Sequence, residues 1–177
     1  MPRLDPRRST LAVIDLQARL MPAIQGGSGV VANTRRLLAT AALLDIPALF
    51  TEQNPRGLGA TVPELAPDAS SVIAKMTFDA TPAPGFLDRL PPDHAVVLTG
   101  CETHVCVLQT ALGLLERGRR VCVVEDAVGS RTVENKAAGL RRLAAEGAEI
   151  ITTEMAVFEW LESAEHPRFR KVIALIK

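Results

Sequence analysis

The sequence predicts one α/β domain in which helices cover both faces of a parallel β-sheet. Short apolar runs alternate with helical stretches from end to end of the chain, and strict alternation of strands and helices gives a parallel sheet. The apolar runs are continuous, which is typical of strands buried on both faces. The length of 177 residues suits a single core, because one domain usually takes about 100–200 residues. We therefore expect one domain over residues 1–177.

The first half of the chain contains three of the expected strands. Residues 10–17 form an apolar run that stops at a carboxylate, and residues 30–46 place leucines at helical spacing with basic residues on the other side. Residues 47–52 and 70–77 are the next two apolar runs, and the polar segment between them, rich in Pro and Gly, predicts a loop. A short helix is expected at 85–90.

The second half repeats the same alternation. Residues 94–100 predict the fourth strand, and a helix follows within the segment that ends at residue 118. Residues 120–131 predict the fifth strand and a turn. Thr132 is the expected N-cap of the next helix and Gly147 its expected stop. The remaining expected elements are a sixth strand at 148–154 and closing helices at 156–163 and 166–177.

The composition excludes several classes of function. Lys and Arg total 20, as do Asp and Glu, so the chain lacks the basic excess that binds nucleic acids or anionic membranes. Aromatic residues make up 3% and tyrosine is absent, which leaves no base-stacking surface. No apolar run approaches the roughly 20 residues that cross a bilayer, and the amino-terminal segment lacks the features of a signal peptide. Three cysteines make a disulfide framework improbable, so we expect free thiols in the cytoplasm.

Three polar residues stand where apolar runs stop: Asp15 after the first, Lys75 after the third and Cys106 just beyond the fourth. Ligands of parallel α/β sheets bind at the carboxyl ends of the strands, so these side chains are expected in one crevice. A helix N-terminus and the ammonium would lower the pKa of the Cys106 thiol and favour the thiolate. Asp15 would move the thiol proton to a leaving group, while backbone N–H groups would hold the oxyanion.

Packing is the alternative explanation for these residues. Cys101 and Cys122 are expected to be small buried hydrophobes, Asp15 alone could be a turn former, and Lys75 alone could lie on the surface with its stem along the sheet. Cys106 differs, because it is expected to point away from the apolar stripe of its helix. That stripe consists of Val105, Leu108, Leu112 and Leu115. The concurrence of the three strand-end residues favours catalysis.

The segments AVIDLQ, AKMTF and GCETHVCVLQTALGLLERGRRVCVVEDAVGSR resemble the isochorismatase-like cysteine hydrolase family, and TEQNPRGLGATVPEL and HPRFRKVIALIK resemble its isochorismatase domain-containing branch. The resemblance covers nearly the whole chain. It implies a six-stranded parallel sheet in a Rossmann-like three-layer α/β/α sandwich, and a catalytic triad of Asp15, Lys75 and Cys106. It also implies a cis peptide bond between Cys101 and Glu102, with the backbone N–H groups of Glu102 and Cys106 forming the oxyanion hole.

The resemblance and the site residues together imply a hydrolase acting on a small amide, or a related C–N acyl bond, through a thioester on Cys106. No metal or other cofactor is expected. The three histidines are scattered, and the segment after the second strand lacks the histidines that hold a metal in the nicotinamidases of this family. Two alternatives remain: hydrolysis of an isochorismate-like vinyl ether with Asp15 as general acid, and a non-catalytic oligomeric binding or scaffold protein.

The expected partners are a small-molecule substrate and further copies of the chain. Candidate pocket residues on the crevice loops are Gln17, Leu20, Asn54, Thr103 and His104. The closing helices carry apolar side chains that either cover the sheet or form a subunit interface. They are Phe158, Trp160, Leu161, Phe169, Ile173 and Ile176. The family resemblance favours a homo-oligomer, a dimer or larger.

Overall fold

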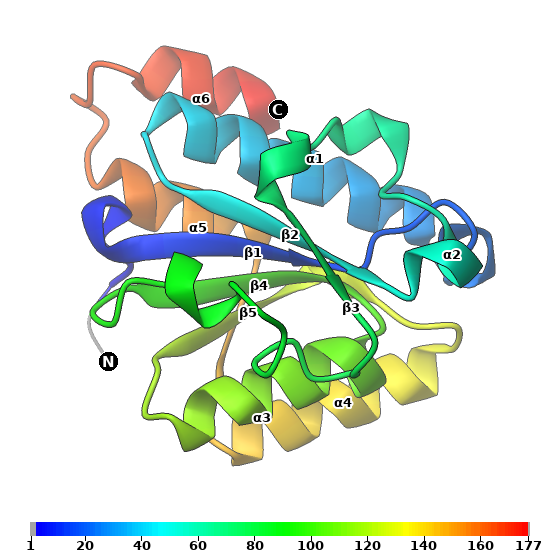
Figure 1. Cartoon of the computed structure of the whole chain (residues 1–177). Coiled ribbons are helices and arrows are strands. Elements are labelled where there is room, and N and C mark those ends of the chain that lie inside the picture. Colours follow the sequence, from blue (N-terminus) through cyan, green and yellow to red (C-terminus); the bar gives the residue numbers. More distant parts are fainter. Residues whose placement is uncertain (1–2, 177) are drawn as a thin grey trace.

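A computed structural model describes residues 3–176 as a six-stranded sheet between two layers of helices (Figure 1). The strand order is β3-β2-β1-β4-β5-β6, and each neighbouring pair runs parallel. The predicted α/β fold with a six-stranded parallel sheet is therefore confirmed. The strands are β1 (Ser9–Ile14), β2 (Ala48–Gln53), β3 (Val72–Lys75), β4 (Ala95–Cys101), β5 (Val121–Gly129) and β6 (Glu149–Ile151).

Helices flank the sheet on both faces. They are α1 (Gly27–Leu43), α2 (Pro55–Leu58), α3 (Leu108–Glu116), α4 (Val133–Ala145), α5 (Thr153–Leu161) and α6 (Phe169–Ile176). Helices α1, α5 and α6 lie on one face and α3 and α4 on the other, whereas α2 lies just beyond the end of β2 (Figure 1). Short 3-10 turns occur at Pro6–Arg8, Met21–Ala23, Pro63–Leu65, Ala69–Ser71 and Leu87–Arg89. The last of these stands in place of the short helix expected at 85–90.

Two apolar cores, one on each face of the sheet, hold the layers together. Every residue of β1 and β4 is buried, as expected for continuous apolar strands at the centre of a parallel sheet. The core beneath α1, α5 and α6 includes Cys101 and Cys122, and the core beneath α3 and α4 includes Cys106. Cys101 and Cys122 are fully buried, which confirms the prediction that they are packing residues.

The two halves of the sheet diverge between β1 and β4. From β1 the chain adds β2 and β3 on one side, and from β4 it adds β5 and β6 on the other. The segments that follow β1 and β4 therefore leave in opposite directions and open a crevice at the carboxyl ends of these strands. Gly100 lets the two strands approach there, because its φ is +118° and a Cβ atom would lie 1.9 Å from the Ile14 carbonyl oxygen.

The helix expected after the fourth strand divides into two parts. Thr103–Val107 is a π-helical turn, and α3 begins only at Leu108. The predicted apolar stripe is wrong, because the π-helical turn breaks the 3.6-residue period on which it was based. Cys106 lies within the core beneath α3 and is 7% exposed. The buried apolar positions that follow it are Val107, Leu108, Ala111 and Leu114, while Leu112 and Leu115 are partly exposed.

The closing helices pack mainly within the chain. In α5, Trp160 and Leu161 are buried, and the Trp160 indole Nε1–H donates to Ser9 Oγ at 3.1 Å. Phe158 is the exception, with 46% of its surface exposed. The apolar residues Phe169, Ile173 and Ile176 of α6 pack against the core beneath α1 and α5. These helices therefore cover the sheet and α1. Among residues 3–176, no helix combines the length and apolar character that crossing a bilayer requires.

Candidate active site

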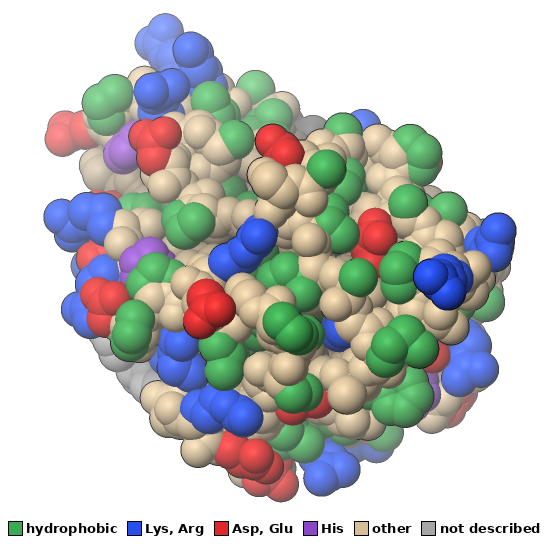
Figure 2. Space-filling view, viewed as in Figure 1, with side chains coloured by type: hydrophobic (Ala, Val, Ile, Leu, Met, Phe, Trp, Pro, Cys, Tyr) green, Lys and Arg blue, Asp and Glu red, His purple; other side chains and the backbone are tan. Residues whose placement is uncertain are grey.

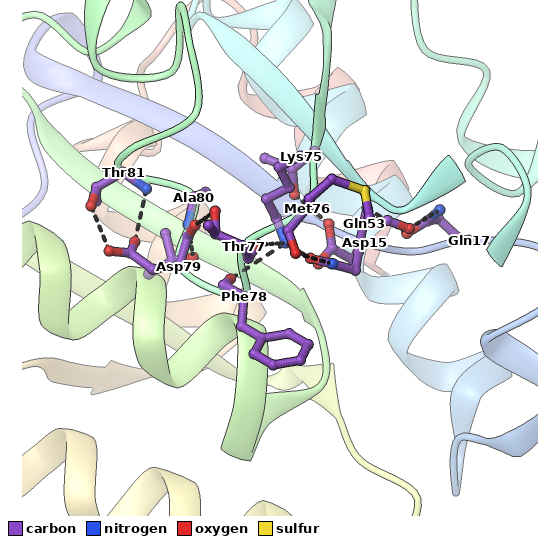
Figure 3. A network of polar contacts seen from close by, with 12 residues as sticks. Asp15, Gln17, Gln53, Lys75, Met76, Thr77, Phe78, Asp79, Ala80 and Thr81 are labelled. Carbon is purple, nitrogen blue, oxygen red and sulfur yellow. Dashed lines mark hydrogen bonds and ion pairs between the residues drawn. The ribbon is translucent and has the colours of Figure 1, made fainter. Parts of the chain in front are cut away.

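Asp15 and Lys75 form a buried ion pair at the carboxyl edge of the sheet (Figure 3). Asp15 comes directly after β1, and Lys75 is the last residue of β3. The Asp15 Oδ2 and Lys75 Nζ atoms are 2.7 Å apart, and neither side chain has exposed surface. Because β2 lies between the two strands, Lys75 reaches Asp15 across the end of β2. The structure thus joins two of the residues selected at the strand ends.

The Lys75 ammonium has four oxygen acceptors. Besides Asp15, they are Gln53 Oε1 at 2.8 Å and the carbonyl oxygens of Thr77 at 3.2 Å and Phe78 at 3.3 Å. An ammonium has three N–H bonds, so the protein engages all of them. Lys75 is therefore a fixed positive charge beside Asp15, with no N–H left for a substrate.

A second group of contacts holds Gln53 next to the Lys75 ammonium. The Gln53 amide Nε2 donates to the Met76 carbonyl at 2.7 Å, which leaves Oε1 facing Lys75. Gln17 pairs with the Gln53 backbone on both sides: its Oε1 accepts from the Gln53 N–H at 2.8 Å, and its Nε2 donates to the Gln53 carbonyl at 3.0 Å. Gln17 Nε2 also donates to the Gly59 carbonyl at 2.6 Å. Gln17 thus joins the end of β2 to the loop at Gly59, and its role as a pocket residue stays a prediction.

Asp15 accepts a second hydrogen bond from the neighbouring strand. Thr51 Oγ1 donates to Asp15 Oδ1 at 2.6 Å, so each carboxylate oxygen holds one donor from the protein. Sequence reasoning missed Thr51 and Gln53. Gln53 could have been predicted, because it is the polar residue at the end of β2, and polar residues at the carboxyl ends of parallel strands face one crevice. Thr51 lies inside the strand and gives no such signal.

Cys106 lies in the π-helical turn, beside the ion pair. Burial raises the pKa of its thiol to about 12; the Asp15 carboxylate raises this pKa too, and the Lys75 ammonium lowers it. Both charges therefore act on the sulfur, which places the three predicted residues in one site. The expected lowering of the thiol pKa is wrong. Burial and the negative charge of Asp15 both raise this pKa, and together they exceed the lowering by the Lys75 ammonium. In its resting state the site contains a protonated thiol.

The residues before Cys106 are joined one by one to the end of β5. Glu102 Oε2 accepts from the Arg131 backbone N–H at 3.1 Å and from Arg131 Nε at 3.0 Å. Thr103 Oγ1 donates to the Gly129 carbonyl at 3.0 Å, and His104 Nδ1 and Ser130 Oγ are 3.0 Å apart. Thr103 and His104, predicted as pocket residues, thus direct polar atoms to the last residue of β5 and to the residue after it. The peptide bond between Cys101 and Glu102 is cis. Sequence reasoning treated Arg131 only as part of a helix cap, and no local pattern marks its partner.

The other two pocket candidates, Leu20 and Asn54, lie in different surroundings. Leu20 packs against the core beneath α1. Asn54 donates its backbone N–H to the Lys75 carbonyl at 2.8 Å and lines a cavity of about 680 Å³ beyond the ends of β2 and β3. Other walls of this cavity are Pro55, Arg56, Met76, Thr77 and Pro82. Lys75 borders the cavity but Asp15 and Cys106 are not among its walls, so the cavity adjoins the site without containing the thiol.

The carboxylates at this edge of the sheet are engaged by protein donors. Asp15 is paired with Lys75, and Glu102 with Arg131. Asp79, on the loop after β3, accepts from the Thr81 N–H at 2.8 Å and from its hydroxyl at 2.6 Å (Figure 3). Within residues 3–176, no three His, Cys, Asp or Glu side chains are grouped as metal ligands. The chemistry that these side chains offer is therefore that of a thiol, a carboxylate and a fixed ammonium.

A doubly wound α/β fold with a thiol and a buried ion pair at its switch point defines the class of this protein. The isochorismatase domain model matches residues 9–155. The chain therefore belongs to the isochorismatase family and has the hydrolase fold of that family.

Known proteins of similar sequence and structure agree with this assignment. The mouse isochorismatase domain-containing protein 2A is 39% identical over 176 residues, which span 99% of this chain and 85% of the mouse protein. A solved structure described as the MAR1 ribonuclease of Caenorhabditis elegans is 37% identical with a TM-score of 0.94, covering 99% of this chain and 92% of that one. The ycaC gene product of Escherichia coli, described as an octameric hydrolase of unknown specificity, is 26% identical with a TM-score of 0.87 over 99% of this chain and 88% of that one.

Proposed function

We propose that this protein is a cysteine hydrolase that cleaves a small amide, or a related C–N acyl bond, through a thioester on Cys106. The observation that carries the proposal is the buried Asp15–Lys75 pair beside the thiol, close enough for both charges to act on its pKa. A carboxylate in this position can accept the thiol proton during attack on a carbonyl carbon. Membership of a hydrolase family supports the same reaction type.

In the first half of the reaction, the Cys106 sulfur attacks the amide carbon while the thiol proton passes to Asp15. An S–C bond forms and the carbonyl π electrons move to the oxygen, which the backbone N–H groups of Glu102 and Cys106 hold. The C–N bond then breaks, and Asp15 gives the proton to the leaving nitrogen. The products are an amine or ammonia and a thioester. Lys75 balances the charge of Asp15 whenever that carboxylate is ionised.

Water completes the reaction. Asp15 accepts a proton from the water molecule that attacks the thioester carbon. The C–S bond breaks, the carboxylic acid leaves, and the sulfur takes up the proton from Asp15. The sum is amide plus water giving acid plus amine, with the protein unchanged. Because burial keeps the resting thiol protonated, the nucleophile forms only when Asp15 takes the proton.

The charges at the site favour an uncharged substrate. Lys75 is engaged by four oxygens, Arg131 by Glu102, and Arg19 by the Arg56 and Gly57 carbonyls at 3.3 and 3.1 Å, whereas the exposed Arg56 lines the cavity beside the site rather than the thiol. Isochorismate is a dicarboxylate and needs cationic partners. A small neutral amide needs none, and of the cations named here only Arg56, on the wall of the adjoining cavity, is exposed with no partner for its guanidinium among these contacts, so the balance favours amide cleavage over the vinyl ether reaction.

Hydrolysis of RNA is a second candidate because the similar Caenorhabditis elegans protein is described as a ribonuclease. The net charge of this chain is zero. Figure 2 shows acidic and basic side chains interspersed on one face, without a continuous basic surface. Binding of a polyanion depends on such a surface. These observations favour the small amide over RNA.

The proposal is tested by acylation of the protein with p-nitrophenyl acetate, followed by intact-mass and peptide analysis, and by ammonia release from a panel of small amides. We expect one acetyl group on Cys106, absent in Cys106→Ala and reduced at least 100-fold in rate in Asp15→Asn, as for loss of a general base. Cys122→Val is the control, because it changes a buried thiol outside the site. Isochorismate and a single-stranded RNA are assayed alongside. Turnover of either by Cys106→Ala, with no acetylation of Cys106 in the unmodified protein, would overturn the proposal.

We also propose that the chain forms a homo-oligomer in the cytoplasm. The similar Escherichia coli protein is described as octameric. Met76 and Phe78, on the loop after β3, are 71% and 52% exposed, and large exposed apolar side chains are common at subunit interfaces. The cysteines at positions 101, 106 and 122 are free thiols, which suits a reducing compartment. Light scattering coupled to size-exclusion chromatography measures the assembly, and a monomer at micromolar concentration contradicts it.

A further inference from the structure

Three consecutive side chains join the turn that contains the proposed oxyanion donors to the last residue of β5 and the two residues after it. Residues 102, 103 and 104 contact residues 131, 129 and 130, respectively. Thr103 and its partner Gly129 are buried, whereas His104 is partly exposed. We refer to these three contacts as the β5 clamp. The clamp holds the backbone between β4 and Cys106 from the side of β5.

Helix α4 packs against the same turn. A Cβ atom at Gly139 of α4 would lie 3.1 Å from the Thr103 carbonyl oxygen and 3.1 Å from the His104 Cα. The backbone of the turn therefore lies directly against α4. Held by these side-chain contacts and packed against α4, the turn has little freedom to move. Rigidity of this kind is what an oxyanion hole requires, because its donors must be aimed before charge develops.

We infer that Arg131 is a positioning residue of the active site, which fixes the Glu102 backbone N–H for the oxyanion by anchoring the Glu102 carboxylate. This inference rests on the proposed function. The Glu102 side chain is 11% exposed and receives two donors from Arg131, one from the backbone and one from the guanidinium. Charge-assisted hydrogen bonds are stronger and more directional than neutral ones. Arg131 itself is 59% exposed, so it can be replaced without opening a core.

A positioning role for Arg131 predicts different effects on two reactions of the Cys106 thiol. Attack on an ester or amide carbonyl creates an oxyanion, which the correctly oriented backbone N–H groups of Glu102 and Cys106 would stabilise. Alkylation by iodoacetamide displaces iodide at a saturated carbon and creates no oxyanion. Loss of the Arg131 contact should therefore slow acylation of Cys106 and leave its alkylation unchanged. A substitution that only destabilised the fold would change the rates of acylation and alkylation by a similar factor.

The experiment compares Arg131→Met with the unmodified protein, using p-nitrophenyl acetate for acylation and iodoacetamide for alkylation, with Cys106 adducts followed by intact mass. Methionine keeps the apolar stem and removes the guanidinium. Removal of one oxyanion donor costs about 100- to 1,000-fold, so we expect misalignment of one donor to cost about tenfold or more in acylation. Alkylation should stay within about twofold. Arg141→Met, an exposed arginine of α4, is the matched control and should change neither rate.

A double-mutant cycle tests whether Arg131 acts through Glu102. Glu102→Gln should lose a similar factor in acylation, and Glu102→Gln with Arg131→Met should lose no more than the larger single change. Equal losses of acylation and alkylation, unchanged acylation in Arg131→Met, or additive losses in the double variant would overturn the inference. Failure of the proposed function looks different, because the unmodified protein would then not be acylated at Cys106.

Discussion

Lys75 brings a positive charge into a site where neither it nor Asp15 has exposed side-chain surface. Moving an ammonium out of water is costly unless an opposite charge and further hydrogen bonds replace the water. Here Asp15 supplies the charge, and Gln53 and two backbone carbonyls supply the remaining acceptors. The same contacts that position Asp15 for catalysis therefore also stabilise the fold, and one substitution affects both.

We predict that Lys75→Met lowers the free energy of unfolding by about 3–5 kcal/mol, because it leaves the Asp15 carboxylate buried without its partner. Urea denaturation at neutral pH measures this loss. The double variant Asp15→Asn Lys75→Met should recover at least half of it, because no unpaired charge remains buried. Lys171→Met, an exposed lysine on α6, is the control and should change stability by less than about 0.5 kcal/mol. A double variant as unstable as Lys75→Met alone would show that unpaired charge is not the cause.

The site residues differ in how far the sequence could predict them. Asp15 and Lys75 follow from one rule, that polar residues at the carboxyl ends of parallel strands face one crevice. Gln53 obeys the same rule but lies one residue beyond the strand predicted at 47–52. Arg131 could not be predicted in this way, because its partner Glu102 is 29 residues away and the contact exists only once β4 and β5 pair. The state of the Cys106 thiol also depends on burial, which its neighbours in sequence do not determine.

At the scale of elements, the close approach of β1 and β4 brings the carboxylate and the thiol together. Ile14 and Gly100 are partners in the register of these strands, and the next residue after Ile14 is Asp15. Gly100 has a φ that side chains rarely adopt, with no room for a Cβ atom. The position of Asp15 relative to the π-helical turn thus depends on a contact between two backbones.

We predict that Gly100→Ala costs about 4 kcal/mol or more in stability, or prevents folding, because the new methyl group would overlap the Ile14 carbonyl and the φ of +118° would be strained. Thermal and urea denaturation measure the effect. The matched control is Gly29→Ala in α1, where a Cβ atom meets nothing within 4 Å. It should be neutral or add up to about 1 kcal/mol through helix propensity. Equal stability of the two variants would contradict the close contact.

The extent of each element was predictable to within a few residues. Continuous apolar runs located all six strands, with boundaries no more than three residues from those observed. The runs extended too far where polar residues after a strand, such as Asp15, leave the sheet to form the site. The π-helical turn at Thr103–Val107 escaped prediction because its local sequence is compatible with an ordinary α-helix. Contacts with β5 and α4 determine its geometry, and these are tertiary.

At the scale of the whole molecule, three thiols are distributed over the two apolar cores. Cys101 and Cys122 lie in the core beneath α1, and Cys106 lies beside the ion pair in the other. Burial raises the pKa of Cys106 and Cys122 to about 12 and raises that of Cys101 as well. An unfolded thiol ionises near pH 8.5. The folded chain therefore retains protons above this pH that the unfolded chain releases, and the chain contains no tyrosine to mask the effect.

We predict that the free energy of unfolding is insensitive to these thiols below about pH 8 and falls as pH rises above about 8.5, with a slope approaching one proton per thiol toward pH 10. The sign follows because raised pKa values in the folded state favour the protonated form, so alkali stabilises the unfolded chain. Urea denaturation under reducing conditions from pH 7 to 10 gives the slope. Cys122→Val keeps an apolar side chain in the core and removes one titrating group, so it should reduce the slope by about one proton, whereas Cys106→Ala should remove another. A slope that is the same in Cys122→Val and in the unmodified protein would mean that Cys122 ionises within the folded core, and the account of Cys122 as a buried packing residue would fail.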